Sequence, residues 1–362
     1  MQTLQNETDN LVRVMSDVMS SNEEVNSSLQ ACFGLLPNSN EEEVSHFMKR
    51  VFALTSLPDM ERASLASTIC GYLVERGFPD NAILDDLINL YIRLLDTSKP
   101  FYDMFFSQIR TIDETDEDRD NKIDQIFADL INDKETISTE VYNAVTSLDK
   151  FYAAAISLFS INKENFYEAK EKLGERVAYV GRFNQGCYWI DTLFSVLFDE
   201  QIIVIDIDKE IGFAGKINGI SDNYQLQHLL MSIPLLNDGK SLISEEDLSI
   251  INGTGDQTSE RSIESRWNMY NLELCSLPDW ESQVKGKEKP SLSQDIQSTW
   301  IWSEGKPDDI SFYDGYRIIL LGKAPYSRSS KVQRTFRNLK AEIEVTRVLS
   351  AAEIDKWLNK TI

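Results

Sequence analysis

The spacing of apolar residues divides the chain into two unlike halves, and the change falls near residue 200. From residue 31 to residue 199, apolar positions recur at the three-to-four-residue spacing of amphipathic helices. After residue 200, short β-branched and aromatic runs alternate with polar segments, which favours strands. We therefore predict an α+β protein, with a mostly helical N-terminal half and a smaller mixed α/β C-terminal domain.

Three segments follow from this division. Residues 1–30 are polar and hold one weakly amphipathic stretch, so they predict an arm or a short helix. Residues 31–199 predict an acidic helical domain. Residues 200–362 predict a mixed α/β domain with aromatic-rich strands and a C-terminal helix.

Prolines recur every 21 residues in the helical half, at Pro37, Pro58, Pro79 and Pro100. Because proline stops one helix and Asn or Asp caps the next, this spacing predicts a helix in each interval. Two such helices span about 42 residues, which lies within the range of HEAT-type hairpins. Only this proline spacing repeats, and the other residue identities do not. We therefore predict stacked antiparallel helices that are HEAT-like at most. The same periodicity predicts further helices at 101–112, 122–133, 136–161, 163–180 and 188–198.

The C-terminal half contains several strand candidates and two helix candidates. The strand candidates are Ile202–Ile205, Phe213–Ile220, Trp267–Leu274, Trp300–Trp302, Tyr316–Leu321 and Ala341–Val348. Helices are expected at Asn223–Met231 and at Ala351–Leu358, where Ser350 and Glu353 have the spacing of a capping box. Residues 237–262 and 281–298 are polar and predict loops.

The formal net charge of −23 is concentrated in the first half of the chain. Residues 1–200 contain 17 basic and 35 acidic residues, whereas residues 201–362 contain 19 and 24. Such an acidic excess disfavours nucleic acid and anionic membranes as partners of the N-terminal half. It permits steering toward a basic protein, while plain solubility is the alternative explanation.

Location and cofactors are constrained by what the sequence lacks. No run reaches the ~18–20 apolar residues that span a bilayer, and the first residues lack the pattern of a signal peptide. The four cysteines are widely spaced and form no CxxC pair. We therefore expect a cytoplasmic protein with free thiols. No phosphate-binding loop or zinc spacing occurs, so no cofactor is predicted.

Residues 116–127 partly match the spacing of a calcium-binding loop. Carboxylates stand at loop positions 1, 3, 5 and 9, which are Asp116, Asp118, Asp120 and Asp124. Asn121 replaces the glycine of the sharp turn, and Phe127 replaces the closing bidentate glutamate. We therefore predict no metal centre and interpret the segment as a solvated acidic loop between helices.

A possible nucleophile is Cys187, which lies at the start of an apolar helix and follows Gln185. A helix N-terminus favours a thiolate, and a preceding Gln can stabilise an oxyanion. The order of residues 184–189 is similar to that of papain-like thiol proteases, and His228 is the histidine that follows it in the chain. The resemblance implies a thiol hydrolase using Cys187 and His228. The alternative is a buried thiol beside Trp189 and a surface histidine.

A basic strip lies near the C-terminus, because no acidic residue occurs between Asp314 and Glu342. It contains seven cations: Arg317, Lys323, Arg328, Lys331, Arg334, Arg337 and Lys340. This strip could bind phosphate or RNA, or it could be a generic or internal surface. Trp300 and Trp302 alternate on the strand expected there, so both side chains should share one face and could line a binding surface.

These features favour a non-catalytic protein–protein interaction protein, such as an inhibitor, an immunity-like protein or an adaptor, that binds a basic partner. The alternatives are the thiol hydrolase and a phosphate- or RNA-binding module on the basic strip. The oligomeric state does not follow from the sequence.

Overall fold

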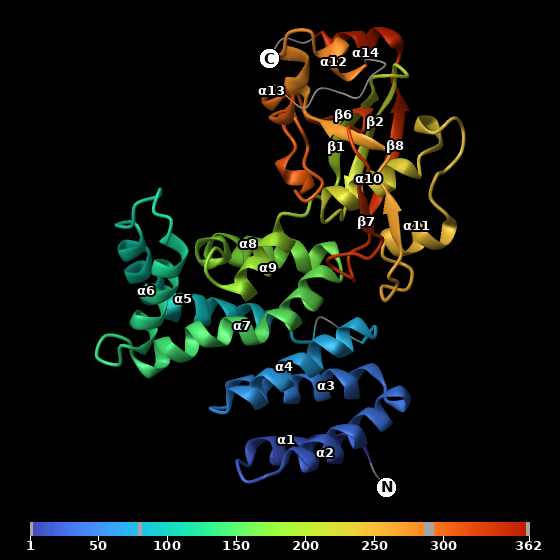
Figure 1. Ribbon diagram of the computed structural model, residues 1–362. Helices are drawn as coiled ribbons and strands as arrows, with labels where there is room; N and C mark the ends of the chain where they lie inside the picture. The colour runs from blue at the N-terminus through green and yellow to red at the C-terminus, as the bar shows by residue number, and fades with distance from the viewer. Residues whose placement is uncertain (1–2, 79–81, 286–292, 360–362) are drawn as a thin grey trace. The chain divides into compact units, whose positions relative to one another are not determined.

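The computed structural model describes residues 3–78, 82–285 and 293–359. The chain divides into two compact units, Met1–Phe194 and Ser195–Ile362. The sequence pattern places this boundary five residues later, between residues 199 and 200. The first unit is helical and the second contains a mixed sheet with helices (Figure 1), so the α+β fold class is confirmed. Among the described residues, no helix has the length and apolar character needed to cross a membrane.

The N-terminal unit begins with a stack of helices. They are α1 (Leu4–Ser16), α2 (Asn22–Leu35), α3 (Glu41–Phe52) and α4 (Met60–Glu75). α1 packs on α2 and α3, and α3 packs on α4. Residues 1–30, for which the polar composition predicts an arm or one short helix, therefore form α1 and most of α2. Buried Leu11 and Met15 fix α1 in the stack, and a capping box of Ser21 and Glu24 starts α2.

The proline spacing marks helix ends in the first part of this unit. Pro37 lies in the 3₁₀ turn η1 (Leu36–Asn38), directly after α2. Pro58 follows a second turn, η2 (Ala53–Ser56), and precedes α4. Pro79 lies outside the described residues.

Pro100 does not end a helix, and the predicted break there is wrong. α5 (Leu84–Ile109) runs through it without interruption. An interior proline costs a helix about 3 kcal/mol. On either side of it, however, Leu95, Phe101 and Phe105 are buried, and burial of each such side chain contributes about 1.5–3 kcal/mol. Tertiary packing therefore outweighs the local cost of proline, and the expected helix at 101–112 is the second half of α5.

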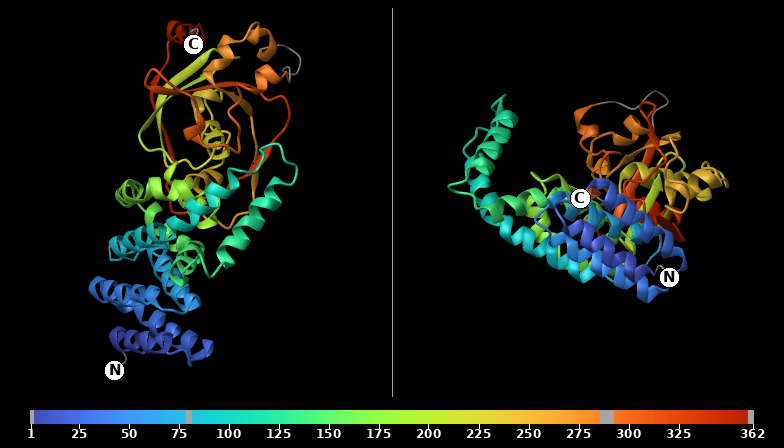
Figure 2. Two further views of the ribbon diagram at one scale, coloured as in Figure 1. Left: turned by 90° about the vertical axis from the view of Figure 1, so that its left-hand side faces the viewer. Right: turned by 90° about the horizontal axis from the view of Figure 1, so that it is seen from below.

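The remaining helices of this unit are α6 (Arg119–Asn132), α7 (Thr139–Ser160), α8 (Lys163–Val180) and α9 (Gln185–Phe194). α7 is central, since α4, α5, α8 and α9 all pack on it. α6 contacts α5 and projects from the other helices of the unit (Figure 2). Because α4 and α5 both pack on α7, the hairpin pairing of a HEAT array is not repeated beyond the first helices.

The C-terminal unit is built on one mixed sheet. Its strands are β1 (Glu200–Asp206), β2 (Ile211–Asn218), β4 (Trp267–Tyr270), β5 (Phe312–Tyr313), β6 (Tyr316–Lys323) and β8 (Glu342–Val348). The order is β4-β6-β1-β2-β8, with β5 paired to β6. β1 and β6 are parallel, and the other neighbours are antiparallel. A separate small sheet joins β3 (Ser262–Glu264) to β7 (Ser329–Lys331).

Helices cover both faces of this sheet, which explains the β-branched run in β1. Ile202 and Val204 face a core that includes α10 (Asn223–Met231) and α11 (Glu245–Ile251). Ile203 and Ile205 face the opposite core. That second core is formed with η4 (Leu272–Ser276), α12 (Trp280–Val284), α13 (Gln294–Gln297) and α14 (Ala351–Leu358). Two further 3₁₀ turns are η3 (Pro234–Leu236) and η5 (Pro307–Asp309).

Several expectations for this unit are confirmed and others are corrected. α14 has the predicted bounds, and the capping box of Ser350 and Glu353 is present. The polar segment 237–262 is not all loop, because it contains α11. The predicted strand at Trp300–Trp302 is wrong: Trp300 makes one isolated bridge to Tyr270, the Ile301 N–H donates to the Met269 carbonyl oxygen at 2.9 Å, and a turn begins after Trp302.

The close contact between α4 and α7 depends on Gly71. A Cβ atom placed on Gly71 would lie 2.9 Å from the Cα atom of Ala154, so no larger residue fits without moving a backbone. Gly34 in α2 is the opposite case, since a Cβ atom there would meet nothing within 4 Å.

Substitution by alanine should therefore have opposite effects on the free energy of unfolding at these two positions. Gly71→Ala should lower the free energy of unfolding by about 1–2 kcal/mol, because it separates two packed helices. Gly34→Ala should raise it by about 0.5–1 kcal/mol, because alanine favours the helix. Denaturant titrations followed by circular dichroism measure both. A stabilising Gly71→Ala would show that α4 and α7 are not in close contact.

Candidate binding site

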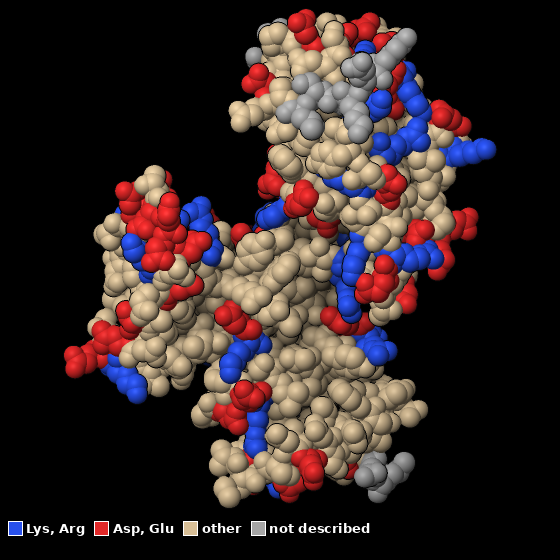
Figure 3. Space-filling model, in the orientation of Figure 1, with Lys and Arg blue, Asp and Glu red and all other residues tan. Residues whose placement is uncertain are grey.

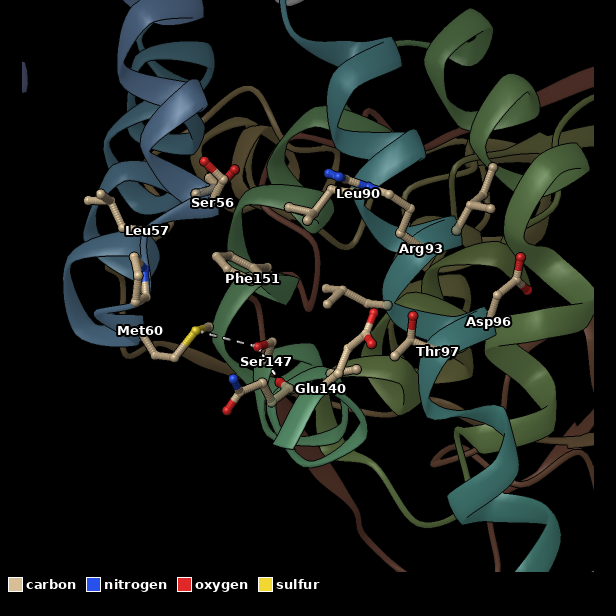
Figure 4. Close-up of a pocket in the computed structure, with 16 residues that line it drawn as sticks. Ser56, Leu57, Met60, Leu90, Arg93, Asp96, Thr97, Glu140, Ser147 and Phe151 are labelled. Atoms are coloured by element: carbon tan, nitrogen blue, oxygen red, sulfur yellow. Dashed lines mark hydrogen bonds between the residues drawn. The ribbon is translucent and has the colours of Figure 1, made fainter. Parts of the chain in front are cut away.

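A candidate site in the N-terminal unit is a groove between η2, the start of α4, the middle of α5 and the first half of α7 (Figure 4). Its volume is about 850 Å³. This is within the range of roughly 300–1,000 Å³ that is typical of ligand pockets. The lining residues are Thr55, Ser56, Leu57, Pro58, Met60, Leu90, Ile92, Arg93, Leu94, Asp96, Thr97, Glu140, Asn143, Ala144, Ser147 and Phe151.

The floor of the groove is largely apolar. Phe151 of α7 and Leu90 of α5 are buried, while Leu94 and Met60 are half-buried. Figure 4 shows Met60 on one side and Leu90 on the other, with Phe151 between them. The Ser147 hydroxyl is satisfied within α7, where it donates to the Asn143 carbonyl oxygen at 2.5 Å. Such a floor can take apolar side chains of a ligand.

The rim of the groove is charged and exposed. Asp96 and Arg93 come from α5, and Glu140 comes from the first turn of α7. Asp96 forms an ion pair with Arg176 of α8 at 3.0 Å. Arg93 and Glu140 form no ion pair with any residue that the structure describes.

The groove ends beside the most acidic part of the unit. The N-terminal unit carries 33 acidic and 17 basic residues, and residues 111–140 alone carry 11 acidic and 3 basic ones. Acidic side chains gather over α6 and its loops (Figure 3), and Glu140 is the last residue of this segment. A field of this sign attracts cations toward that end of the groove.

The four candidate calcium ligands are not assembled into a site. Asp116 forms an ion pair with Lys122, and its Oδ1 accepts from the backbone N–H of Asp118 at 2.9 Å. Asp120 and Asp124 are exposed on α6, because the helix already begins at residue 119. Among the described residues, no group of three or more Asp, Glu, His or Cys side chains is placed to hold a metal ion.

Cys187 lies in the first turn of α9 and is fully buried. Burial and the nearby carboxylates of Asp149 and Asp191 raise the pKa of its thiol well above the ordinary value. The N-terminal N–H groups of the helix are already used: Gly186 donates to Asp149 Oδ1 at 2.7 Å, and Cys187 donates to Asn184 Oδ1 at 2.8 Å. These features disfavour a thiolate and occupy two backbone N–H groups that could otherwise stabilise an oxyanion.

His228 lies in the C-terminal unit, on α10, and Gln185 is exposed at the start of α9. The expectation that His228 is a surface residue is wrong, because α10 is covered on nearly all sides. Burial lowers the pKa of its imidazole, and Nε2 lies 3.1 Å from the Ser330 hydroxyl oxygen. It is therefore a neutral, hydrogen-bonded core residue at neutral pH.

The basic strip does not form one continuous surface. Arg317 is half-buried and forms ion pairs with Glu200 at 2.9 Å and Asp308 at 3.0 Å. Arg334 is buried, and its guanidinium donates to the carbonyl oxygens of Gly219 and Asn252.

The other cations of the strip differ in their surroundings. Lys331 is exposed and forms an ion pair with Glu260. Lys323, Arg337 and Lys340 are exposed, and they form no ion pair with described residues.

Three of the predicted binding residues do come together around Tyr326. The ring of Trp300 lies 5.3 Å from that of Trp302 and 6.2 Å from that of Tyr326. The Arg328 guanidinium lies 5.0 Å from the Tyr326 ring and donates to Asn268 Oδ1 at 2.6 Å. Trp300 is 6% exposed and Trp302 is 51% exposed, so Trp300 belongs to the core and Trp302 reaches the surface beside it.

The groove cannot be predicted from the sequence. Its apolar residues follow the same helical spacing as the core, so they cannot be told from core residues by pattern. One weak signal exists in α5, where Leu94 widens the apolar face beside charged Arg93 and remains half-buried. Comparisons with protein-family models, with curated proteins and with solved structures found no match.

The burial of the thiols predicts their reactivity. Iodoacetamide should label Cys275 first in the native protein, because it is half-buried whereas Cys32, Cys70 and Cys187 are buried. Cys187 should react no faster than Cys32 or Cys70. Peptide mass spectrometry over a time course measures each rate, and preferential labelling of Cys187 would support the thiol-hydrolase hypothesis.

Proposed function

We propose that the protein is a non-catalytic protein–protein interaction protein, and that its helical unit binds a cationic amphipathic segment of a partner. The observation that carries this proposal is the groove, which combines an apolar floor with an acidic end. An amphipathic helix or strand with basic residues complements both properties. An inhibitor, an immunity-like protein and an adaptor are all forms of this activity.

The two parts of the groove have separate tasks in this proposal. Apolar side chains of the segment contact Leu90, Leu94 and Phe151, and their burial supplies most of the affinity. Basic side chains lie toward Glu140 and the acidic segment 111–140, which increases the rate of encounter and orients the partner. Binding of this kind weakens as salt screens the charges.

A filled groove should not bind such a segment. Asn143 lines the groove and is exposed, so Asn143→Trp should occupy its mouth without disturbing the fold. Asn26→Trp is the matched control, because Asn26 is an exposed residue of α2 outside the groove. The probe is a fluorescent synthetic peptide with Leu and Lys at helical spacing, and a Leu/Glu peptide of the same spacing tests the sign of the charge.

Fluorescence anisotropy should show binding of the Leu/Lys peptide to the wild-type protein and to Asn26→Trp. Affinity should fall at least about tenfold in Asn143→Trp, which corresponds to about 1.4 kcal/mol. The Leu/Glu peptide should bind more weakly than the Leu/Lys peptide. Equal affinity of all three proteins, or of both peptides, would reject the groove as the binding site.

A further inference from the structure

A second pocket of the helical unit has a different character and is independent of the groove. It lies between the end of α5, the start of α6 and the end of α8, and its volume is about 470 Å³. It is lined by Phe106, Ile109, Arg110, Ile112, Glu114, Arg119, Ala178, Tyr179, Arg182 and Phe183. In a unit with 33 acidic and 17 basic residues, three arginines meet at this one pocket.

The three arginines reach the pocket from different segments. Arg110 follows α5, Arg119 is the first residue of α6, and Arg182 follows α8. None of their side chains forms an ion pair or a hydrogen bond with the residues that the structure describes. Nε of Arg119 is buried and has no acceptor there.

The arginines of this unit fall into a paired and an unpaired group, and Arg93 of the groove, like the three arginines of the pocket, forms no ion pair with described residues. Arg50 and Arg176 of the same unit each hold a carboxylate, at 2.8 Å and 3.0 Å. Glu114 lines the pocket and yet is not within ion-pair distance of any of the three guanidiniums. Three guanidiniums and one carboxylate give the lining a formal charge of about +2. Among the described residues, no carboxylate lies within ion-pair distance of these guanidiniums.

The pocket also has aromatic walls. The ring of Phe106 lies 4.9 Å from that of Tyr179 and 5.5 Å from that of Phe183. The Tyr179 hydroxyl donates to Asp103 Oδ1 at 2.5 Å, and Lys99 also donates to this carboxylate. Burial and this hydrogen bond to Asp103 raise the pKa of Tyr179 to about 12. The ring is therefore fixed and its hydroxyl stays neutral.

We propose that this pocket binds a small phosphate ester that carries a planar ring, such as a nucleoside monophosphate. A guanidinium binds phosphate oxygens through two parallel hydrogen bonds, and arginine is the side chain best suited to that geometry. A phosphate monoester carries a charge of about −1.5 to −2 at neutral pH, which matches the lining. Aromatic rings at 4.9–5.5 Å from one another offer edges and faces for a planar group.

The probes are AMP, inorganic phosphate and adenosine, and the measurement is isothermal titration calorimetry of the full chain at low salt. AMP should bind, inorganic phosphate should bind more weakly, and adenosine should give no heat. Phe183→Leu should weaken AMP and leave inorganic phosphate unchanged, because it removes only an aromatic wall. If inorganic phosphate binds as tightly as AMP, the proposed contact between the aromatic walls and a planar ring of the ligand is wrong.

Two variants test the arginines without endangering the fold. Arg110→Gln and Arg182→Gln change exposed side chains, and each should weaken AMP binding at least tenfold. Arg76→Gln is the matched control, because Arg76 is an exposed arginine of the same unit outside this pocket. An absence of heat with AMP and phosphate, or an equal loss in Arg76→Gln, would overturn the proposal.

Discussion

The N-terminal unit depends on the burial of α7 against its neighbouring helices. α4, α5, α8 and α9 pack on it, and the contact with α4 is close enough that position 71 must be glycine. The second half of α7 is buried on several sides, through Ala154, Ala155 and Leu158 among others. Its first half is less covered, because α4 and α5 approach it from different directions. The groove is the space that remains between these two contacts.

The distribution of charge follows a different constraint from the packing. Acidic residues occupy the first turns of many helices, where they interact favourably with the helix dipole, as Glu41–Glu43 do in α3. Segment 111–140 contains more acidic residues than interaction with helix dipoles explains, and few of its carboxylates form an ion pair with a described residue. Its self-repulsion opposes folding, so the excess is not explained by stability. The unpaired arginines beside it are a second departure from the pairing that would stabilise the fold most.

The sequence predicted best those elements in which local signals and burial agree. β1 is a β-branched run buried on both faces, and α14 has both a capping box and an apolar stripe, so both were found. The break at Pro100 was wrongly predicted because the free-energy cost of an interior proline is smaller than the stabilisation that comes from burying the residues around it. The strand at Trp300–Trp302 was wrongly predicted because the aromatic alternation there is accompanied by only a single bridge, at Trp300.

The two sites could not be predicted from the sequence, and the reason is physical. The floor of the groove is made of apolar residues that match the core pattern, and only the three-dimensional arrangement leaves some of them partly uncovered. The arginines of the second pocket lie nine and 63 positions apart along the chain, so no local run of basic residues marks them. The charge pattern along the chain therefore does not reveal these arginines. The same pattern suggested one basic surface at residues 317–340, although those cations are dispersed in the structure.

Net charge is too coarse a measure to decide what such a unit binds. α5 connects the two sites, since Arg93 of α5 lines the groove and Arg110, directly after α5, lines the second pocket. These positions are separated by about 25 Å along a helix with a rise of about 1.5 Å per residue. That separation is about three times the screening length of roughly 8 Å at physiological salt. Each site therefore acts through its own nearby charges, and one acidic unit can attract a cation at one end of α5 and an anion at the other.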